Sequence, residues 1–120
     1  MIAFRPFPRA TERFERCERL TVAERVIAPI LVDLGPGFVS AGSRERSWAS
    51  ATFTGARHYL SLSGSGDDAM ARAQALRDTI GAIEFDVKGH VIADIAVTDI
   101  VVSAEGSVRL AIEALAVEAC

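Results

Sequence analysis

The final third of the chain alternates between apolar and polar residues, which is the pattern of β-strands with one face in solvent. One alternating run begins after Gly89, and Glu105-Gly106 then supplies a two-residue turn. The register set by this turn places Asp99 opposite Ile112, among apolar residues of the same face. The predicted pairs are Val101 with Leu110, Asp99 with Ile112, Val97 with Ala114, and Ile95 with Ala116. The sequence therefore predicts a long C-terminal β-hairpin.

Further strands are predicted upstream of this hairpin. Residues 38–63 are rich in Thr, Ser, Ala and aromatic side chains, which favour strands. Within them, residues 49–62 form one long candidate strand whose alternation slips by one position after Gly55. A β-bulge at Gly55 explains the slip and turns His58 toward the core. A short strand is also predicted over 83–87, where apolar and acidic residues alternate.

Apolar residues at helical spacing predict a helix over 22–34. Thr21 followed three residues later by Glu24 forms a capping box, which satisfies the free N–H groups of a helix start. Pro29 lies inside the pattern, and we expect it to kink or break the helix.

A second helix is predicted over 69–80, where apolar residues gather on one side and Gly81 ends the pattern. The loop before it ends in two aspartates, which the dipole of a helix N-terminus favours. The candidate N-caps are Ser65 and Asp67. This helix is expected to lie on the sheet.

The N-terminal region has a different character. Residues 1–9 contain two prolines, so they are predicted to form an extended arm. Phe4 and Phe7 are suited to attach this arm to the body of the protein or to a partner. Residues 11–20 have an apolar residue at every third position and are predicted to be helical.

These elements together predict an α+β fold with a mainly antiparallel sheet of four or five strands and helices packed on one face. A chain of 120 residues has room for one hydrophobic core, so residues 1–120 are expected to form a single domain.

The distribution of charged residues bears on whether the protein binds nucleic acid. The basic side chains are twelve arginines and the single Lys88, a usage typical of GC-rich bacterial genomes, and the net charge is -3. Glu12, Glu15 and Glu18 interleave with the basic run and largely neutralise it, which argues against nucleic-acid binding. The arginines of this run are Arg5, Arg9, Arg13, Arg16 and Arg19.

Cysteine usage and hydropathy indicate a cytoplasmic protein. Cys17 and Cys120 form no CxxC pair and no ligand cluster with a histidine, so no metal site is expected. No apolar stretch has the length of a signal peptide or a membrane span, so no membrane association is expected.

Gly64-x-Gly66-x-x-Ala69 has the spacing of a dinucleotide-binding loop. Asp67 and Asp68, however, place two carboxylates where a pyrophosphate would need hydrogen-bond donors. The remaining chain is also too short for a doubly wound sheet. We therefore expect no dinucleotide cofactor and interpret the segment as a loop that leads into a helix.

Two inward polar residues are candidates for chemistry. His58 and Asp99 are both predicted on apolar faces, where they would form a general acid/base couple in a cavity or a satisfied buried hydrogen bond. Tyr59, His90 and Asp94 are the candidate ligand-binding residues, and His90 and Asp94 share a face if their strand is regular.

The C-terminal strand also suggests self-association. Residues 114–117 are apolar on both faces, and two helices with an arm are too few to cover both faces of a four-stranded sheet. We expect a symmetric homodimer, and a non-enzymatic module that binds a protein partner or a small apolar ligand. The alternative is a small enzyme, of the isomerase or lyase type, that uses the His58–Asp99 pair.

Overall fold

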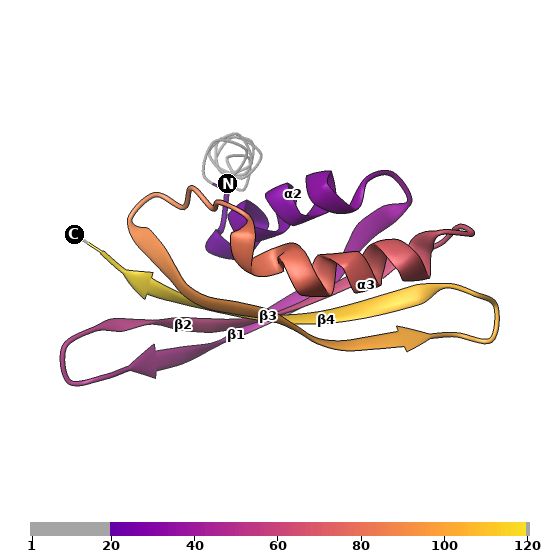
Figure 1. The fold of residues 1–120 in the computed structure, drawn as a ribbon. Coiled ribbons are helices and arrows are strands. Elements are labelled where there is room, and N and C mark those ends of the chain that lie inside the picture. Colours follow the sequence, from indigo (N-terminus) through magenta and orange to yellow (C-terminus); the bar gives the residue numbers. More distant parts are fainter. Residues whose placement is uncertain (1–19, 120) are drawn as a thin grey trace, which may run out of the picture.

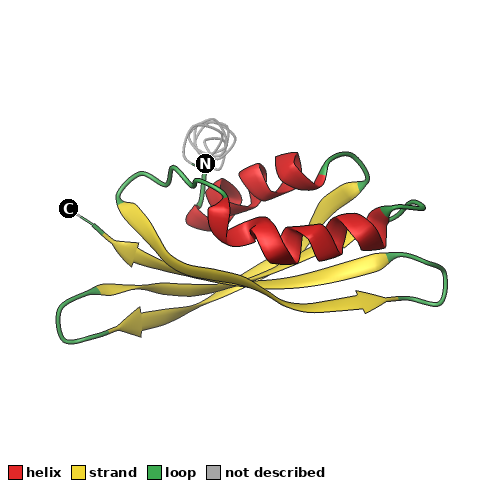
Figure 2. Cartoon of the chain, viewed as in Figure 1, coloured by secondary structure: helices red, strands yellow, loops and turns green. Residues whose placement is uncertain are grey.

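The computed structural model describes residues 20–119, which form one four-stranded antiparallel sheet covered on one face by two α-helices (Figures 1 and 2). The elements are α2 (Val22–Leu34), β1 (Phe38–Ala49), β2 (Thr54–Gly64), α3 (Ala69–Thr79), the 3₁₀ turn η2 (Ile80–Ala82), β3 (His90–Val102) and β4 (Val108–Glu118). The predicted α+β class and C-terminal hairpin are confirmed. The predicted arm 1–9 and helix 11–20 lie outside the described residues.

The strand order is β1-β2-β4-β3, so the sheet consists of two hairpins joined through α3. β2 and β4 pair in the middle, and β1 and β3 are the edges. A single helical crossover is sufficient for this arrangement, because it returns the chain to the far edge and lets β4 pair with β2.

The core lies between the helices and one face of the sheet. Every second residue of β4 from Val108 to Ala116 is buried, as a strand with one covered face requires. The main core residues are Val26, Ile27, Ile30 and Leu34 from α2, Ala69, Ala73 and Leu76 from α3, Leu60 and Leu62 from β2, and Leu110, Ile112 and Ala114 from β4. We call this side of the sheet the covered face and the other side the open face.

The capping box of α2 is confirmed. The Thr21 hydroxyl accepts a hydrogen bond from the Glu24 amide at 3.1 Å, and the Glu24 carboxylate accepts one from the Thr21 amide at 2.8 Å. The expected break at Pro29 is wrong, because the helix continues through it. Buried Ile27 and Ile30 flank the proline, so tertiary packing holds the helix on both sides of it.

Arg72 of α3 joins the two helices. Its guanidinium donates hydrogen bonds to the carbonyl oxygens of Leu34 at 2.8 Å and Pro36 at 2.7 Å, just where α2 ends. Gly35 has φ +87°, so the chain turns there in a conformation that favours glycine. Arg72 therefore satisfies carbonyl groups that the end of a helix leaves free.

The start of α3 differs from the prediction. The N-cap is Asp68, in place of Ser65 or Asp67, and its side chain makes no capping hydrogen bond in the described part of the chain. It instead forms an ion pair with Arg72, one turn along the helix, at 3.1 Å. Because of the ion pair with Arg72, the Asp68 carboxylate does not cap the N-terminus of α3.

The predicted strand over 49–62 is wrong in its boundaries. β1 runs on to Ala49, a turn follows, and β2 begins at Thr54. The Ser50 hydroxyl closes this turn by accepting hydrogen bonds from the Thr52 and Phe53 amides. The bulge expected at Gly55 is also absent, because the register between β1 and β2 is continuous there.

Residues 83–87 are not a strand, in contrast to the prediction. Alternate side chains of this segment point toward the core, namely those of Ile83, Phe85 and Val87. The acidic residues between them are exposed. Within residues 20–119 the segment pairs with no strand, and the sheet ends at β3 on this side.

The predicted register of the C-terminal hairpin is wrong as well. Asp99 pairs with Ala111 instead of Ile112. The connection is longer than two residues, because the Ser103 hydroxyl accepts hydrogen bonds from the Glu105 and Ser107 amides and draws residues 103–107 into the loop. Two β-bulges in β3 shift the register further. The bulged residues are Ala93 and Thr98.

Candidate functional site

His58 lies on the covered face, where it pairs with Ala114 and is only 3% exposed. Its Nδ1 atom is buried and has no hydrogen-bond partner among the described residues. Asp99 pairs with Ala111 and is exposed. Because Ala111 and Ala114 are three positions apart on one strand, His58 and Asp99 lie on opposite faces of the sheet. The predicted His58–Asp99 couple is therefore not formed.

The acid that accompanies His58 is Glu45. The two residues face each other across the β1–β2 pair, and His58 Nδ1 lies 3.7 Å from Glu45 Oε1. This distance is slightly too long for a direct hydrogen bond. The Glu45 side chain is 66% exposed and the His58 side chain 4%, so water reaches the carboxylate side of the pair.

A small cavity of about 220 Å³ surrounds this pair at the end of the sheet where α2 begins. His90 and Glu118 pair across β3 and β4 and line the same cavity. His90 is thus brought to His58 as a candidate ligand-binding residue. Asp94 is not, because the bulge at Ala93 moves it to the open face opposite Leu115.

Burial lowers the pKa of His58 below its usual 6.5; Glu45 opposes this shift and His90 adds to it. A neutral imidazole with an unpartnered Nδ1 can accept a proton or a hydrogen bond from a small molecule. No group of three or more His, Cys, Asp or Glu side chains within residues 20–119 is placed to hold a metal ion. Among the same residues, no helix has the length and apolar character needed to cross a bilayer.

The open face is made of five rows of side chains, each with one residue from every strand. Read in the order β1, β2, β4 and β3, the rows are Trp48-Gly55-Val117-Val91 (row 1), Arg46-Arg57-Leu115-Asp94 (row 2), Arg44-Tyr59-Glu113-Ala96 (row 3), Gly42-Ser61-Ala111-Asp99 (row 4) and Val39-Ser63-Arg109-Val101 (row 5). Both described helices lie on the other side of the sheet.

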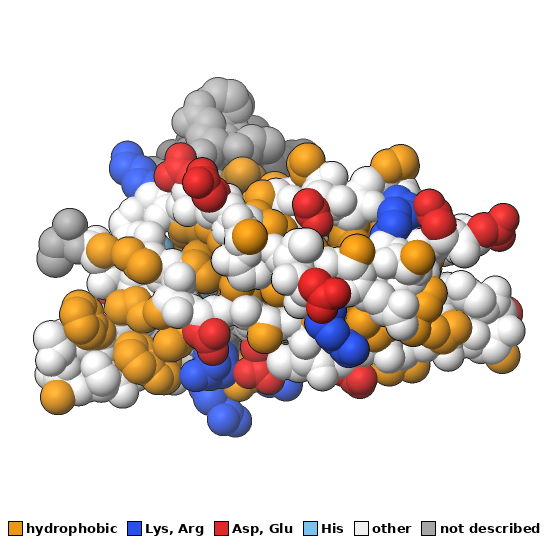
Figure 3. Space-filling view, in the orientation of Figure 1, with side chains coloured by type: hydrophobic (Ala, Val, Ile, Leu, Met, Phe, Trp, Pro, Cys, Tyr) orange, Lys and Arg blue, Asp and Glu red, His pale blue; other side chains and the backbone are white. Residues whose placement is uncertain are grey.

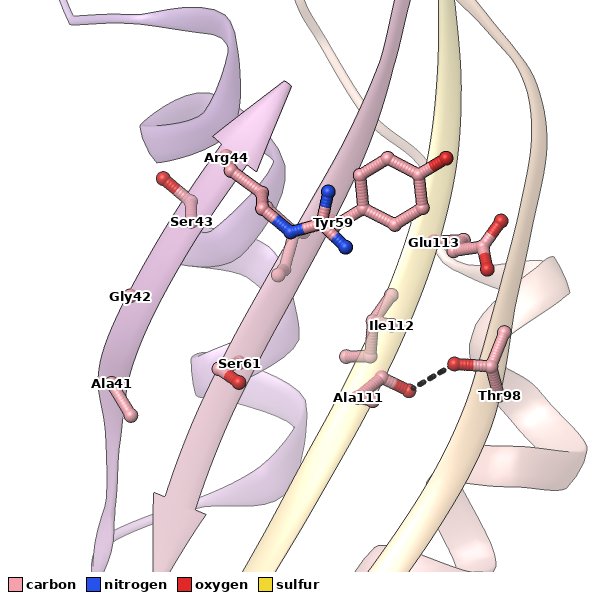
Figure 4. Close-up of a pocket in the computed structure, with 11 residues that line it drawn as sticks. Ala41, Gly42, Ser43, Arg44, Tyr59, Ser61, Thr98, Ala111, Ile112 and Glu113 are labelled. Carbon is pink, nitrogen blue, oxygen red and sulfur yellow. Dashed lines mark hydrogen bonds between the residues drawn. The ribbon is translucent and has the colours of Figure 1, made fainter. Parts of the chain in front are cut away.

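Tyr59 lies in the middle of this face, away from the His58 cavity. The Arg44 guanidinium stacks over its ring, 4.2 Å from the centroid. Arg57 forms an ion pair with Glu113 at 3.7 Å. Figure 4 shows Arg44, Tyr59 and Glu113 side by side on three strands, at the edge of a shallow hollow of about 440 Å³.

An apolar hollow occupies one end of the open face. It has a volume of about 990 Å³ and is lined by Trp48, Phe53 and Val91, together with Leu115 and Val117. Phe53 is 54% exposed and Val91 is 55% exposed. Figure 3 shows apolar side chains gathered at this end of the molecule, near the β1–β2 turn. Large exposed apolar groups that adjoin one another usually mark a contact surface.

Comparison of the chain with protein-family models, with curated proteins and with solved structures gives no match.

The sequence interpretation missed Glu45, Glu118 and Trp48. The richness of 38–49 in Ser, Ala and aromatic residues is the signal that places Glu45 and Trp48 on a strand. The sequence does not reveal which strand pairs with residues 38–49. The Glu45–His58 pair could therefore be identified only from the observed β1–β2 register.

Proposed function

We propose that the protein is a non-enzymatic homodimeric assembly module and that a second copy covers the open face of its sheet. The observation that carries this proposal is the apolar hollow at the row 1 end of the open face. Leu115 and Val117 lie in the middle of the sheet on the side without a described helix. Together with Trp48, Phe53 and Val91 they form the apolar hollow. Burial of such a surface against a second copy removes apolar area from water.

The size of the sheet indicates how extensive the contact can be. Five rows on four strands cover a surface of roughly 14 by 27 Å, from strand spacings of about 4.8 Å and rises of about 3.4 Å per residue. Side chains that project from both copies enlarge the area. These dimensions give about 380 Å² per copy before side chains are counted, which places the contact among weak protein–protein interfaces.

The test is the mass of the particle in solution, measured by size-exclusion chromatography with light scattering. The wild-type chain is expected to be a dimer at micromolar concentration. Val91→Glu places a charge in the apolar hollow and should give a monomer. Val32→Glu is the matched control, since Val32 is 82% exposed on α2 and should not affect the mass. A wild-type monomer would contradict the proposal, and so would a dimer that Val91→Glu leaves intact.

A second candidate function is acid–base catalysis at the His58 cavity, with Glu45 in the role first assigned to Asp99. The buried Nδ1 of His58 favours it, because this atom has no hydrogen-bond partner within residues 20–119 and a small molecule could supply one. We propose proton abstraction from a small molecule, as in an isomerase or lyase.

Deuterium exchange in D₂O, followed by NMR over a panel of small carbonyl compounds, tests this second candidate. Exchange that the wild-type protein accelerates and that His58→Gln abolishes would support it. If no compound exchanges faster than with His58→Gln, His58 is not a catalytic base for this class.

A further inference from the structure

In rows 2 to 4 of the open face, charge is divided between the two halves of the sheet, and Arg109 of β4, in row 5, is the exception to this division. Arg44, Arg46 and Arg57 come from β1 and β2, whereas Glu113, Asp94 and Asp99 come from β4 and β3. Figure 3 shows Lys and Arg side chains beside Asp and Glu side chains on the side away from the helices. A surface divided in this way is complementary to itself if each half meets the opposite half of a second copy.

A two-fold axis between two facing sheets can run along the strands or across them. An axis along the strands keeps each row opposite the same row and places β1 over the partner's β3. An axis across the strands keeps each strand opposite itself and exchanges row 1 with row 5 and row 2 with row 4. The residues in the rows decide between the two.

The axis across the strands brings like charges together. In row 3, Arg44 would face the partner's Arg44, and Glu113 would face the partner's Glu113. Asp94 of row 2 would face the partner's Asp99 of row 4. Like charges held opposite one another in an interface oppose association, so this arrangement is disfavoured.

The axis along the strands gives matched contacts instead. Arg46 faces the partner's Asp94 in row 2, and symmetry makes this contact twice. In row 1, Trp48 faces the partner's Val91. In row 5, Val39 faces the partner's Val101. No row places like charges opposite one another.

The geometry of stacked sheets allows these contacts. Facing sheets lie about 10 Å apart and cross at about 30°. The edge strands are about 7 Å from an axis between β2 and β4, so a crossing centred on row 3 displaces facing edge residues by about 4 Å in row 3 and about 5 Å in row 2. Arginine side chains are long enough to span such an offset.

We propose that the second copy binds with the two-fold axis along the strands and that Arg46 of each copy pairs with the partner's Asp94. This inference rests on the proposed dimer, and it adds the orientation and the residues that specify the partner. Among residues 20–119, neither Arg46 nor Asp94 forms an ion pair within its own chain.

Charge reversal tests the pairing. Arg46→Asp and Asp94→Arg should each raise the dimer dissociation constant about 30-fold, because two ion pairs become two repulsive contacts. An equimolar mixture of the two variants should form a heterodimer with wild-type affinity, since both of its contacts are again opposite in charge. The double variant should likewise restore the homodimer. Arg77→Asp and Asp78→Arg, on the exposed side of α3, are the matched controls and should change nothing.

The outcomes separate the two proposals. Native mass spectrometry and sedimentation equilibrium give the species and the dissociation constants. A monomeric wild-type chain overturns the homodimer itself. A dimeric wild type whose two single variants still form homodimers, or whose mixture prefers no heterodimer, overturns the pairing of Arg46 with Asp94 and leaves the homodimer standing. Preferential heterodimer formation confirms the pairing.

Discussion

Acidification should destabilise the protein through His58. The side chain is buried, and this burial lowers the pKa of His58 below its usual 6.5. In the unfolded chain the imidazole is solvated and titrates near its ordinary value. As pH falls through 6.5, the unfolded state therefore takes up a proton before the folded state does. The free energy of unfolding therefore has its full value above pH 6.5 and decreases below that pH.

The difference is at most one proton, so His58 can contribute a slope of at most about 1.4 kcal/mol per pH unit. The loss begins near pH 6.5 and ends once the pH has dropped below the pKa of His58 in the folded protein. Glu45 raises that pKa, with its Oε1 atom 3.7 Å from the ring. Glu45→Gln should therefore extend the loss to lower pH.

The assay is urea unfolding followed by far-UV circular dichroism, at a fixed protein concentration and at several pH values between 5.5 and 7.5. His58→Gln removes the titrating group and should flatten the slope relative to the wild type. The comparison uses slopes, so any constant effect of the substitution cancels. Equal slopes in the wild type and His58→Gln would refute the argument that burial holds this imidazole neutral.

Two further substitutions test the link between the two helices and the packing of β1 on β2. Arg72→Met keeps the apolar stem but removes two hydrogen bonds to carbonyl groups, and should lower the free energy of urea unfolding by about 2–3 kcal/mol. Arg77→Met is the exposed control. Equal effects of the two substitutions would contradict the role assigned to Arg72. Gly64→Ala directs a methyl group into the Phe38 ring and should cost about 1–3 kcal/mol in the same assay, whereas Gly81→Ala meets open space. A neutral Gly64→Ala would show that the ring does not pack on this glycine.

The helices were predictable because their signals are local. Thr21 and Glu24 lie within one turn of each other, and the apolar spacing of 22–34 identifies the buried side of the helix without knowledge of its partner. Pro29 was misjudged, because the packing that holds the helix together around it comes from the sheet.

The strand register could not be predicted in the same way. It depends on the hydroxyl of Ser103, which sets the length of the β3–β4 loop, and on bulges that local alternation does not reveal. One shifted position was sufficient to move Asp99 from the covered to the open face. The inward direction of His58 was predicted, but its neighbour Glu45 comes from a strand whose pairing only the fold defines.

The most direct test of the central claim measures how accessible the open face is in solution. A soluble paramagnetic agent broadens the NMR signals of methyl groups that it can reach. In a dimeric sample the methyl groups of Val91, Leu115 and Val117 should be protected, and they should become accessible on dilution to the monomer, whereas Val32 on α2 stays accessible throughout. Open-face methyl groups as accessible as those of Val32 at high concentration, or protected at every dilution, would contradict coverage of this face by a second copy.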